Sequence, residues 1–247
     1  MLVGVIDDAL VMQLFNELGH DVVDLNVMTN YKRSMETIEQ GMLDLVVFTG
    51  GADVTPSFYG EPAHPATHSQ LVRDNAEKRA FNKCAARDIP MAGICRGAQF
   101  LTVMNGGKLV QHVNGHGLGG VHTHGATCFD SSATAVMNKQ DTFHVQCTST
   151  HHQVMYPFNL DDSEFELLAW ARQNPSVVEG MPCSLEYKDV DRFYETEAVW
   201  FPKNKCLCTQ FHPEYVGNEH ECFKYYEWLI NRYIVGIKDQ WMMEIFK

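Results

Sequence analysis

Short apolar runs alternate with stretches of helical periodicity through the first half of the chain. Leu2–Ile6, Asp21–Leu25 and Leu43–Phe48 have the pattern of buried strands, and the last of them is apolar at nearly every position. The intervening segments, one ending at Leu18 and one over Ser34–Gly41, have helical spacing. This alternation predicts an α/β fold built on a doubly wound, mostly parallel sheet flanked by helices, with function at the carboxyl ends of the strands.

The segment Ile89–Gly107 predicts a sharp corner from a strand into a helix. Cys95 follows an apolar run and precedes the helical pattern Arg96–Asn105, with Gly93 and Gly97 on either side. Gly-x-Cys-x-Gly is the nucleophile-elbow pattern with sulfur in place of oxygen. The corner strains the central residue and crowds its neighbours, and the new helix directs free N–H groups and its positive dipole end at the thiol. The alternative is a buried cysteine between incidental glycines.

Two further segments carry polar chemistry near predicted strand ends. Gly50-Gly51 directly follows a buried strand, so that unobstructed N–H groups there suit an anion or oxyanion, although an ordinary glycine turn explains the pair alone. Arg73-Asp74 opens a predicted helix and is either a substrate contact or an ion pair.

His212 and Glu214 supply the base that a thiolate nucleophile needs and the group that orients it. They are one residue apart at the end of a predicted strand, where positions i and i+2 point to one side, and Pro213 keeps the segment extended. We expect the imidazole to reach Cys95 if the two strand ends are neighbours in the sheet. A surface turn is the alternative for this tripeptide in isolation.

The second half contains a histidine-rich stretch and a segment without a clear pattern. The histidines are His112, His116, His122 and His124. Such spacing can build a zinc site, but no cysteine or carboxylate completes a set in this stretch, so we expect a polar pocket rim, no metal and no cofactor. We interpret residues 154–195 as a lid or insertion and the whole of 1–247 as one domain.

Motifs along residues 43–216 resemble those of class I glutamine amidotransferase-like proteins. The free-standing branch that includes gamma-glutamyl-gamma-aminobutyrate hydrolase and its peptidase relatives is most similar. The matching motifs are Gly50-Gly51-x-Asp53-Val54-x-Pro56-x-x-Tyr59-Gly60-Glu61, Arg73-Asp74-x-x-Glu77, Gly93-Ile94-Cys95-Arg96-Gly97-x-Gln99, Gly106-Gly107-x-Leu109-x-Gln111, Ser149-x-His151-His152-Gln153 and Gln210-x-His212-Pro213-Glu214. The chain departs from the branch at Thr148, usually Asn, and at Phe100, often acidic.

The resemblance implies a flavodoxin-like fold with a nucleophile elbow, and a set of site residues. The implied triad is Cys95, His212 and Glu214, the implied oxyanion donors are the backbone N–H groups of Gly51 and Arg96, and the implied glutamyl contacts are Gln99, Ser149, Thr150 and His151. The implied reaction is thiolate attack on a gamma-glutamyl amide, either glutamine or a gamma-glutamyl amine, followed by hydrolysis of the thioester.

Three alternatives to a hydrolase acting alone remain open. A glutaminase subunit would deliver ammonia to a separate synthetase partner, a silent module would bind glutamyl compounds without turnover, and a thiol sensor would react at Cys95 without turnover. The first alternative predicts slow cleavage of glutamine until the partner binds. The intact set of Cys, His and Glu favours an enzyme over the last two.

Composition narrows the class of partner. The 247 residues are 45% hydrophobic and 20% charged, with only 19 Lys and Arg and a net charge of −12, which disfavours nucleic acid. No apolar run is long enough to span a membrane, the N-terminus lacks signal-peptide features, and the eight cysteines are too sparse for a disulfide framework. We therefore expect a cytoplasmic protein with reduced thiols and a small-molecule substrate.

Overall fold

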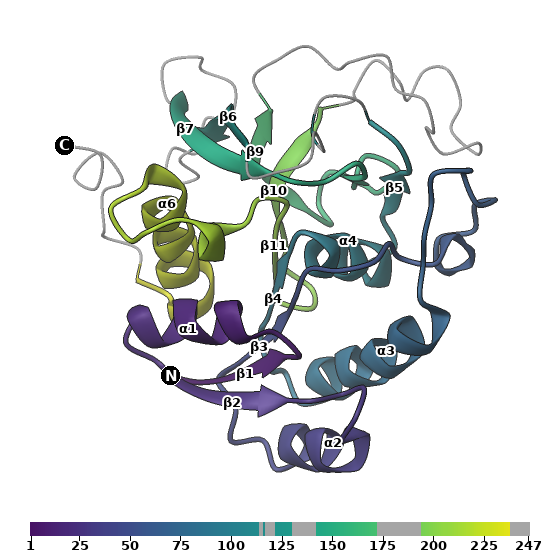
Figure 1. Ribbon diagram of the computed structural model, residues 1–247, viewed down its shortest axis with the longest axis vertical. Helices are drawn as coiled ribbons and strands as arrows, with labels where there is room; N and C mark the ends of the chain where they lie inside the picture. The colour runs from purple at the N-terminus through teal and green to yellow at the C-terminus, as the bar shows by residue number, and fades with distance from the viewer. Residues whose placement is uncertain (114–115, 117–121, 130–141, 172–193, 238–247) are drawn as a thin grey trace.

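One large sheet organises the molecule. The computed structural model describes residues 1–247 except 114–115, 117–121, 130–141, 172–193 and 238–247 (Figure 1). Within the described residues the sheet has eleven strands, ordered β2-β1-β3-β4-β11-β10-β9-β6-β7, while β5 pairs with β8 and β8 with β10. The strands are β1 (Leu2–Ile6), β2 (Asp21–Leu25), β3 (Leu45–Phe48), β4 (Met91–Ile94), β5 (Lys108–Val110), β6 (His122–Phe129), β7 (Thr142–Ser149), β8 (Val154–Tyr156), β9 (Glu166–Ala171), β10 (Thr196–Phe201) and β11 (Cys206–Thr209).

Helices connect the parallel strands and cover the sheet. The α-helices are α1 (Ala9–Glu17), α2 (Tyr31–Glu39), α3 (Leu71–Ala86), α4 (Arg96–Met104) and α6 (Glu221–Leu229). Two 3₁₀ turns, η1 (Pro56–Phe58) and η2 (Pro213–Tyr215), and a π-helical turn, η3 (Ile230–Val235), complete the helical elements. None of the helices in the described part of the chain combines the length and apolarity needed to cross a membrane.

The predicted α/β fold is confirmed, and its parallel part carries the elbow. Strands β2, β1, β3, β4 and β11 pair in parallel, with β4 between β3 and β11. The sheet then continues through the antiparallel strands β10, β9, β6 and β7. The carboxyl ends of β3, β4 and β11 therefore meet at one edge, where the sequence places its glycine turn, its cysteine and its histidine.

Alternation along the buried strands separates two hydrophobic layers. Val5, Val47 and Ile94 pack with side chains of α1 and α6, whereas Val46 and Phe48 pack with side chains of α2, α3 and α4. Figure 1 shows the same division, with α1 and α6 on one side of the strands and α3 and α4 on the other. Successive strand residues point to opposite faces, so that each apolar run serves both layers.

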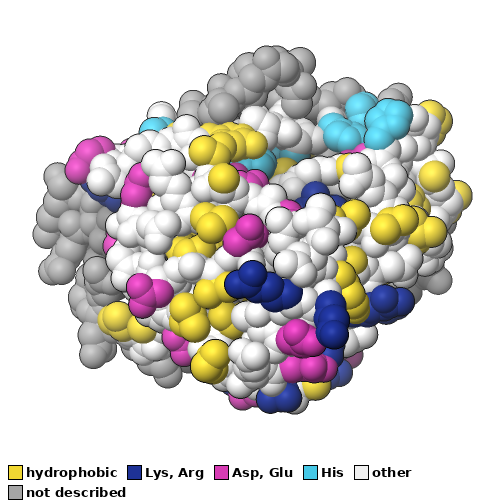
Figure 2. Space-filling view, turned by 60° about the horizontal axis from the view of Figure 1, so that its bottom comes forward, with side chains coloured by type: hydrophobic (Ala, Val, Ile, Leu, Met, Phe, Trp, Pro, Cys, Tyr) yellow, Lys and Arg dark blue, Asp and Glu magenta, His cyan; other side chains and the backbone are white. Residues whose placement is uncertain are grey.

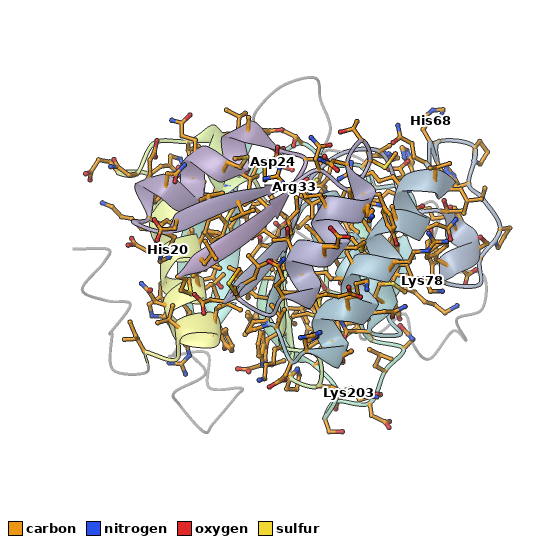
Figure 3. The ribbon with its side chains drawn as sticks, turned by 90° about the horizontal axis from the view of Figure 1, so that it is seen from below. His20, Asp24, Arg33, His68, Lys78 and Lys203 are labelled. Atoms are coloured by element: carbon orange, nitrogen blue, oxygen red, sulfur yellow. The ribbon has the colours of Figure 1, made fainter. Side chains whose placement is uncertain are left out.

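The helix α3 shows how periodicity separates buried from exposed charge. Asp74 and Glu77 face inward and have no exposed surface. Lys78 of the same helix is exposed and lies at the outer side of α3 in Figure 3. Residues three apart share a face of a helix, so the two acidic side chains are directed together toward the sheet.

Element boundaries differ from the predictions at two places that matter. The strand predicted to end at His212 stops at Thr209, and the 3₁₀ turn η2 begins at Pro213. Near the C-terminus, α6 is followed directly by the π-helical turn η3. Of the predicted lid, β8 and β9 lie in the sheet, and residues 172–193 lie outside the described residues. The prediction of one domain stays a prediction.

Candidate active site

Cys95 lies at a strained corner between β4 and α4. Its backbone has φ 51° and ψ −111°, a left-handed conformation that costs a non-glycine residue about 1–3 kcal/mol. A Cβ atom on Gly93 would lie 2.6 Å from the backbone of Ala98, and one on Gly97 would lie 2.0 Å from the carbonyl oxygen of Phe48. Both flanking positions therefore require glycine for steric reasons. The side chain of Cys95 is 8% exposed, so that the thiol sits just beneath the surface.

The sheet register brings His212 next to the elbow. β11 pairs with β4 through Thr209 and Ile94, so the chain leaves both strands at the same edge. Thr148 then fixes the backbone of His212, because its Oγ1 accepts from the His212 N–H at 2.7 Å and donates to the His212 carbonyl at 3.1 Å. The imidazole lies where the charge of Cys95 raises its pKa.

Glu214 contacts the other nitrogen of the same imidazole. His212 Nδ1 lies 2.5 Å from Glu214 Oε1, and the ring stacks on Tyr215 with centroids 4.3 Å apart. The proposed strand geometry for this pair is wrong. Pro213 starts the 3₁₀ turn η2, and that tight turn, rather than an i, i+2 strand spacing, folds the carboxylate back onto the ring.

The protonation of His212 follows from its neighbours. Burial alone would lower the pKa of His212. The interaction with Cys95 and the hydrogen bond and charge of Glu214 outweigh burial and raise this pKa from 6.5 to about 10. His212 is therefore an imidazolium at neutral pH. In this state the ring holds a proton that it can give to a leaving group.

The glycine turn after β3 lies across from the elbow. β3 pairs with β4 through Phe48 and Gly93, and a Cβ atom on Gly50 would lie 3.1 Å from Cε1 of His212. Gly51 has φ +142°, which L side chains rarely adopt. Arg96 is the first residue of α4, and first-turn N–H groups have no partner within a helix. The glycine turn therefore lies beside the His212 ring, and Arg96 directly follows Cys95 in the chain.

Buried charges attach this turn to the elbow. The guanidinium of Arg96, 1% exposed, pairs with both Asp74 and Glu77. Arg73 Nε donates to Glu77 at 2.7 Å, and its Nη2 donates to the Thr49 carbonyl at 3.2 Å. Asp74 is therefore an ion-pair partner, and Arg73 supports the turn from behind: a Cβ atom on Gly51 would meet its Nη1 at 2.1 Å.

Asp74 also holds the loop that leaves this turn. Its Oδ2 accepts from the Thr55 N–H at 2.9 Å and from the Thr55 hydroxyl at 2.5 Å. The sequence analysis missed the side chain of Arg96 as an ion-pair partner. The spacing 73, 74 and 77 on one helix face was the available signal.

Gln99, the first of the predicted glutamyl contacts, is buried and hydrogen-bonded to two other glutamines. Gln99 Nε2 donates to the Gln153 carbonyl at 3.0 Å and to Gln210 Oε1 at 3.1 Å, and the residue is 2% exposed. Gln210, which the sequence analysis left outside the site, directs its Nε2 to the sulfur of Cys95 at 3.7 Å. Gln99 therefore reaches the nucleophile through a second amide.

The other predicted contacts lie close together. Ser149 and His151 are buried, with His151 Nε2 3.4 Å from Ser149 Oγ, and Thr150 between them is half-buried. Ser149 Oγ also lies 3.0 Å from Nδ1 of His116. His151 and Gln99 meet at one atom, because His151 Nδ1 and Gln99 Nε2 each lie 3.0 Å from the carbonyl oxygen of Gln153.

Two of the four histidines of the stretch, His112 and His116, have different neighbours. His112 stacks on His64 at 5.3 Å and lies 5.9 Å from His152. Figure 2 shows histidine side chains gathered on one part of the surface. His116 lies in the buried group with Ser149. The side chains of His122 and His124 lie outside the described residues. The hydrogen bond to Asp53 raises the pKa of His152 against the opposing effect of burial.

Comparison with known proteins finds sequences and structures similar to this chain. The family model described as Peptidase C26 matches residues 6–214. The YvdE homologue of Lactococcus lactis subsp. cremoris, described as a putative glutamine amidotransferase-like protein, is 36% identical over 106 residues, 42% of this chain and 54% of that protein. The chain spans about half the length of the curated relatives that it matches.

Two solved structures show the same fold at low identity. The glutaminase domain of Trypanosoma brucei CTPS with bound acivicin has a TM-score of 0.58 and 14% identity, and the alignment covers 98% of this chain and 96% of that chain. PurLQS from Thermotoga maritima has a TM-score of 0.57 and 12% identity, covering 92% and 97%. At these identities the likeness concerns the fold.

Proposed function

The chain belongs to the Peptidase C26 family, and from this premise we propose that it hydrolyses a gamma-glutamyl amide bond with Cys95 as nucleophile. The observation that carries the proposal is the arrangement at the edge of the sheet. A cysteine at positive φ acts electrostatically on an imidazole, which in turn is hydrogen-bonded to a carboxylate. This is the nucleophile, base and orienting group of covalent amide hydrolysis.

The first half-reaction would form a thioester. The Cys95 thiolate attacks the gamma-carbonyl carbon, and the resulting oxyanion accepts hydrogen bonds from the N–H groups of Arg96 and Gly51. The His212 imidazolium gives its proton to the departing nitrogen as the C–N bond breaks, which releases ammonia or an amine. Glu214 holds the Nδ1 proton of the ring throughout, so that Nε2 faces the sulfur.

The second half-reaction would regenerate the thiolate. Neutral His212 removes a proton from water, the hydroxide attacks the thioester carbonyl, and the C–S bond breaks to give a gamma-carboxylate. Gln210 Nε2, aimed at the sulfur, would stabilise its negative charge both before attack and on departure. The ion network of Arg73, Glu77 and Arg96 keeps the two oxyanion donors at a fixed separation.

Turnover of a panel of gamma-glutamyl amides, glutamine included, tests this function. The wild-type chain should release amine or ammonia from at least one member, and Cys95→Ala should abolish release while leaving the melting temperature within a few degrees. Release that persists in Cys95→Ala would remove the nucleophile from the proposal. Retained glutamyl binding with no turnover by the wild type would instead favour a binding module.

A glutaminase subunit is the second candidate. The likeness to a structure described as a glutaminase domain favours it. The two candidates differ in what the isolated chain can do. A stand-alone hydrolase should cleave a small gamma-glutamyl amine at full rate without help, whereas a glutaminase subunit should prefer glutamine and accelerate only when a synthetase partner is added.

A further inference from the structure

Two imidazoles and a carboxylate converge in the interior beside β10. One ligand atom from each of His116, His151 and Glu197 lies within 4.8 Å of the others, and all three residues are buried. The rings of the two histidines stack with centroids 4.7 Å apart, and His151 Nε2 lies 3.9 Å from Glu197 Oε1. We propose that this cluster binds a divalent transition-metal ion, with Zn²⁺ as the reference ion. Two imidazoles and a carboxylate are one of the donor sets found at zinc sites.

The contacts of His151 distinguish its two ring nitrogens. Its Nδ1 lies 3.0 Å from the carbonyl oxygen of Gln153. A carbonyl can only accept, so Nδ1 carries a hydrogen, and Nε2 lies on the side of Ser149 Oγ, 3.4 Å away, and Glu197 Oε1, 3.9 Å away. A metal-bound histidine usually donates its second N–H in this way, which fixes both the tautomer and the ring plane.

The two histidines are also tied to each other through the backbone. The His151 N–H donates to the His116 carbonyl at 3.1 Å, and Ser149 Oγ donates to the same carbonyl at 3.2 Å. The cluster thus joins a residue of the histidine-rich stretch, the segment before β8 and the strand β10. These contacts hold the ligand atoms close before any ion arrives.

Glu195 provides an independent indication that a cation belongs here. Its Oε2 lies 3.2 Å from His116 Nε2, whereas its Oε1, buried in a residue that is 4% exposed, has no hydrogen-bond partner among the described residues. An unpaired carboxylate oxygen in the interior is costly. We assign Glu195 as the fourth ligand.

Two imidazoles and two carboxylates make a set of four donors, and zinc takes four ligands in tetrahedral sites. His116 lies between two members of the group, with Nδ1 3.0 Å from Ser149 Oγ and Nε2 3.2 Å from Glu195 Oε2. The sequence analysis found no carboxylate for this stretch because both lie some eighty residues downstream, on or next to β10.

Metal titration of the full chain, stripped with chelator, tests the site without reference to turnover. Calorimetry with Zn²⁺ should show one tight equivalent, and Co²⁺ should give a visible spectrum of nitrogen and oxygen ligation without a sulfur charge-transfer band. His151→Ala and Glu197→Gln should each weaken binding by about 10-fold or more. His116→Gln, with circular dichroism to verify folding, replaces either variant if it fails to fold.

Two controls separate this site from other places where an ion could bind. His112→Ala removes a histidine of the same stretch whose ring stacks on His64, outside the cluster, and should bind Zn²⁺ as the wild type does. Cys95→Ala should also bind normally. Loss of binding in either control, undiminished binding in the cluster variants, or no tight equivalent in the wild type would overturn the site. Each of these results is independent of whether the chain hydrolyses glutamyl amides.

Discussion

The protonation of His212 connects the structure of the site to its pH dependence. Its pKa is raised from 6.5 to about 10, against the effect of burial, by Cys95 and Glu214. Because the folded-state pKa is the higher one, the bound proton stabilises the folded chain fully below pH 6.5, and this stabilisation is lost as pH rises through about 10. The imidazolium that donates the proton to the leaving group is lost as pH rises through about 10.

Replacing Glu214 with Gln tests the origin of this shift. The change keeps the shape of the side chain but removes its charge, so that the pKa of His212 should fall. We expect the alkaline limb of kcat against pH, near pH 10 in the wild type, to move to lower pH, and kcat to drop by roughly 10²–10⁴-fold. An unchanged limb with unchanged kcat would show that Glu214 does not act on the ring.

At the scale of elements, two glycines allow the elbow to exist. Gly97 packs against the carbonyl of Phe48 so closely that a Cβ atom would lie 2.0 Å from that oxygen, which is backbone and cannot turn aside. Gly93 is similarly close to Ala98. The strand, the corner and the helix can therefore approach β3 only without side chains at these positions.

Gly97→Ala should destabilise the chain and displace the nucleophile. Overpacking of this kind costs about 1–3 kcal/mol or more, and we expect denaturant unfolding to show at least that loss. Gly217→Ala is the matched control, because nothing lies within 4 Å of its added Cβ atom, and it should change the unfolding free energy by less than about 0.5 kcal/mol. Equal effects of the two substitutions would contradict the packing argument.

The ion network beneath the elbow gives a second test at this scale. Glu77 is shared by Arg73 and Arg96, so Glu77→Gln removes one of the two carboxylates of the buried network and leaves Asp74 as the partner of Arg96. The expected loss is about 3–5 kcal/mol of unfolding free energy. Glu36→Gln on α2 removes one member of an exposed pair, whose side chains are 56% and 89% exposed, and should cost under about 0.5 kcal/mol. A similar loss from both variants would argue against buried charge as the cause.

For the molecule as a whole, the sequence predicted the parts of the site that depend on periodicity. The apolar runs located β3, β4 and β11, and their shared edge follows from parallel pairing once Cys95 and His212 are placed at strand ends. The turn at Pro213 was not predicted, because a short His-Pro-Glu segment fits both extended and 3₁₀ backbone. Gln210 at the sulfur and the carboxylates beside His116 depend on contacts between distant segments, which periodicity does not encode.

The distribution of thiols gives a prediction for the intact molecule. Burial raises the pKa of Cys84 and of Cys206 to about 12, and that of Cys208 well above its ordinary 9.0. Cys95, by contrast, interacts with the imidazolium of His212. Iodoacetamide at neutral pH should therefore alkylate Cys95 before Cys84, Cys206 or Cys208. Peptide mapping after brief exposure measures this order, and prior reaction of Cys84 or Cys208 would contradict it.

Labelling with a glutamine analogue tests the central claim most directly. The electrophile 6-diazo-5-oxo-norleucine requires both a thiolate and a pocket for the glutamyl group, so intact-mass and peptide mass spectrometry should find one adduct, on Cys95. The reaction should slow strongly in His212→Asn and should be blocked by excess glutamine or a gamma-glutamyl amine. No adduct, or an adduct at another cysteine, would contradict the account of Cys95 as the nucleophile of a glutamyl hydrolase.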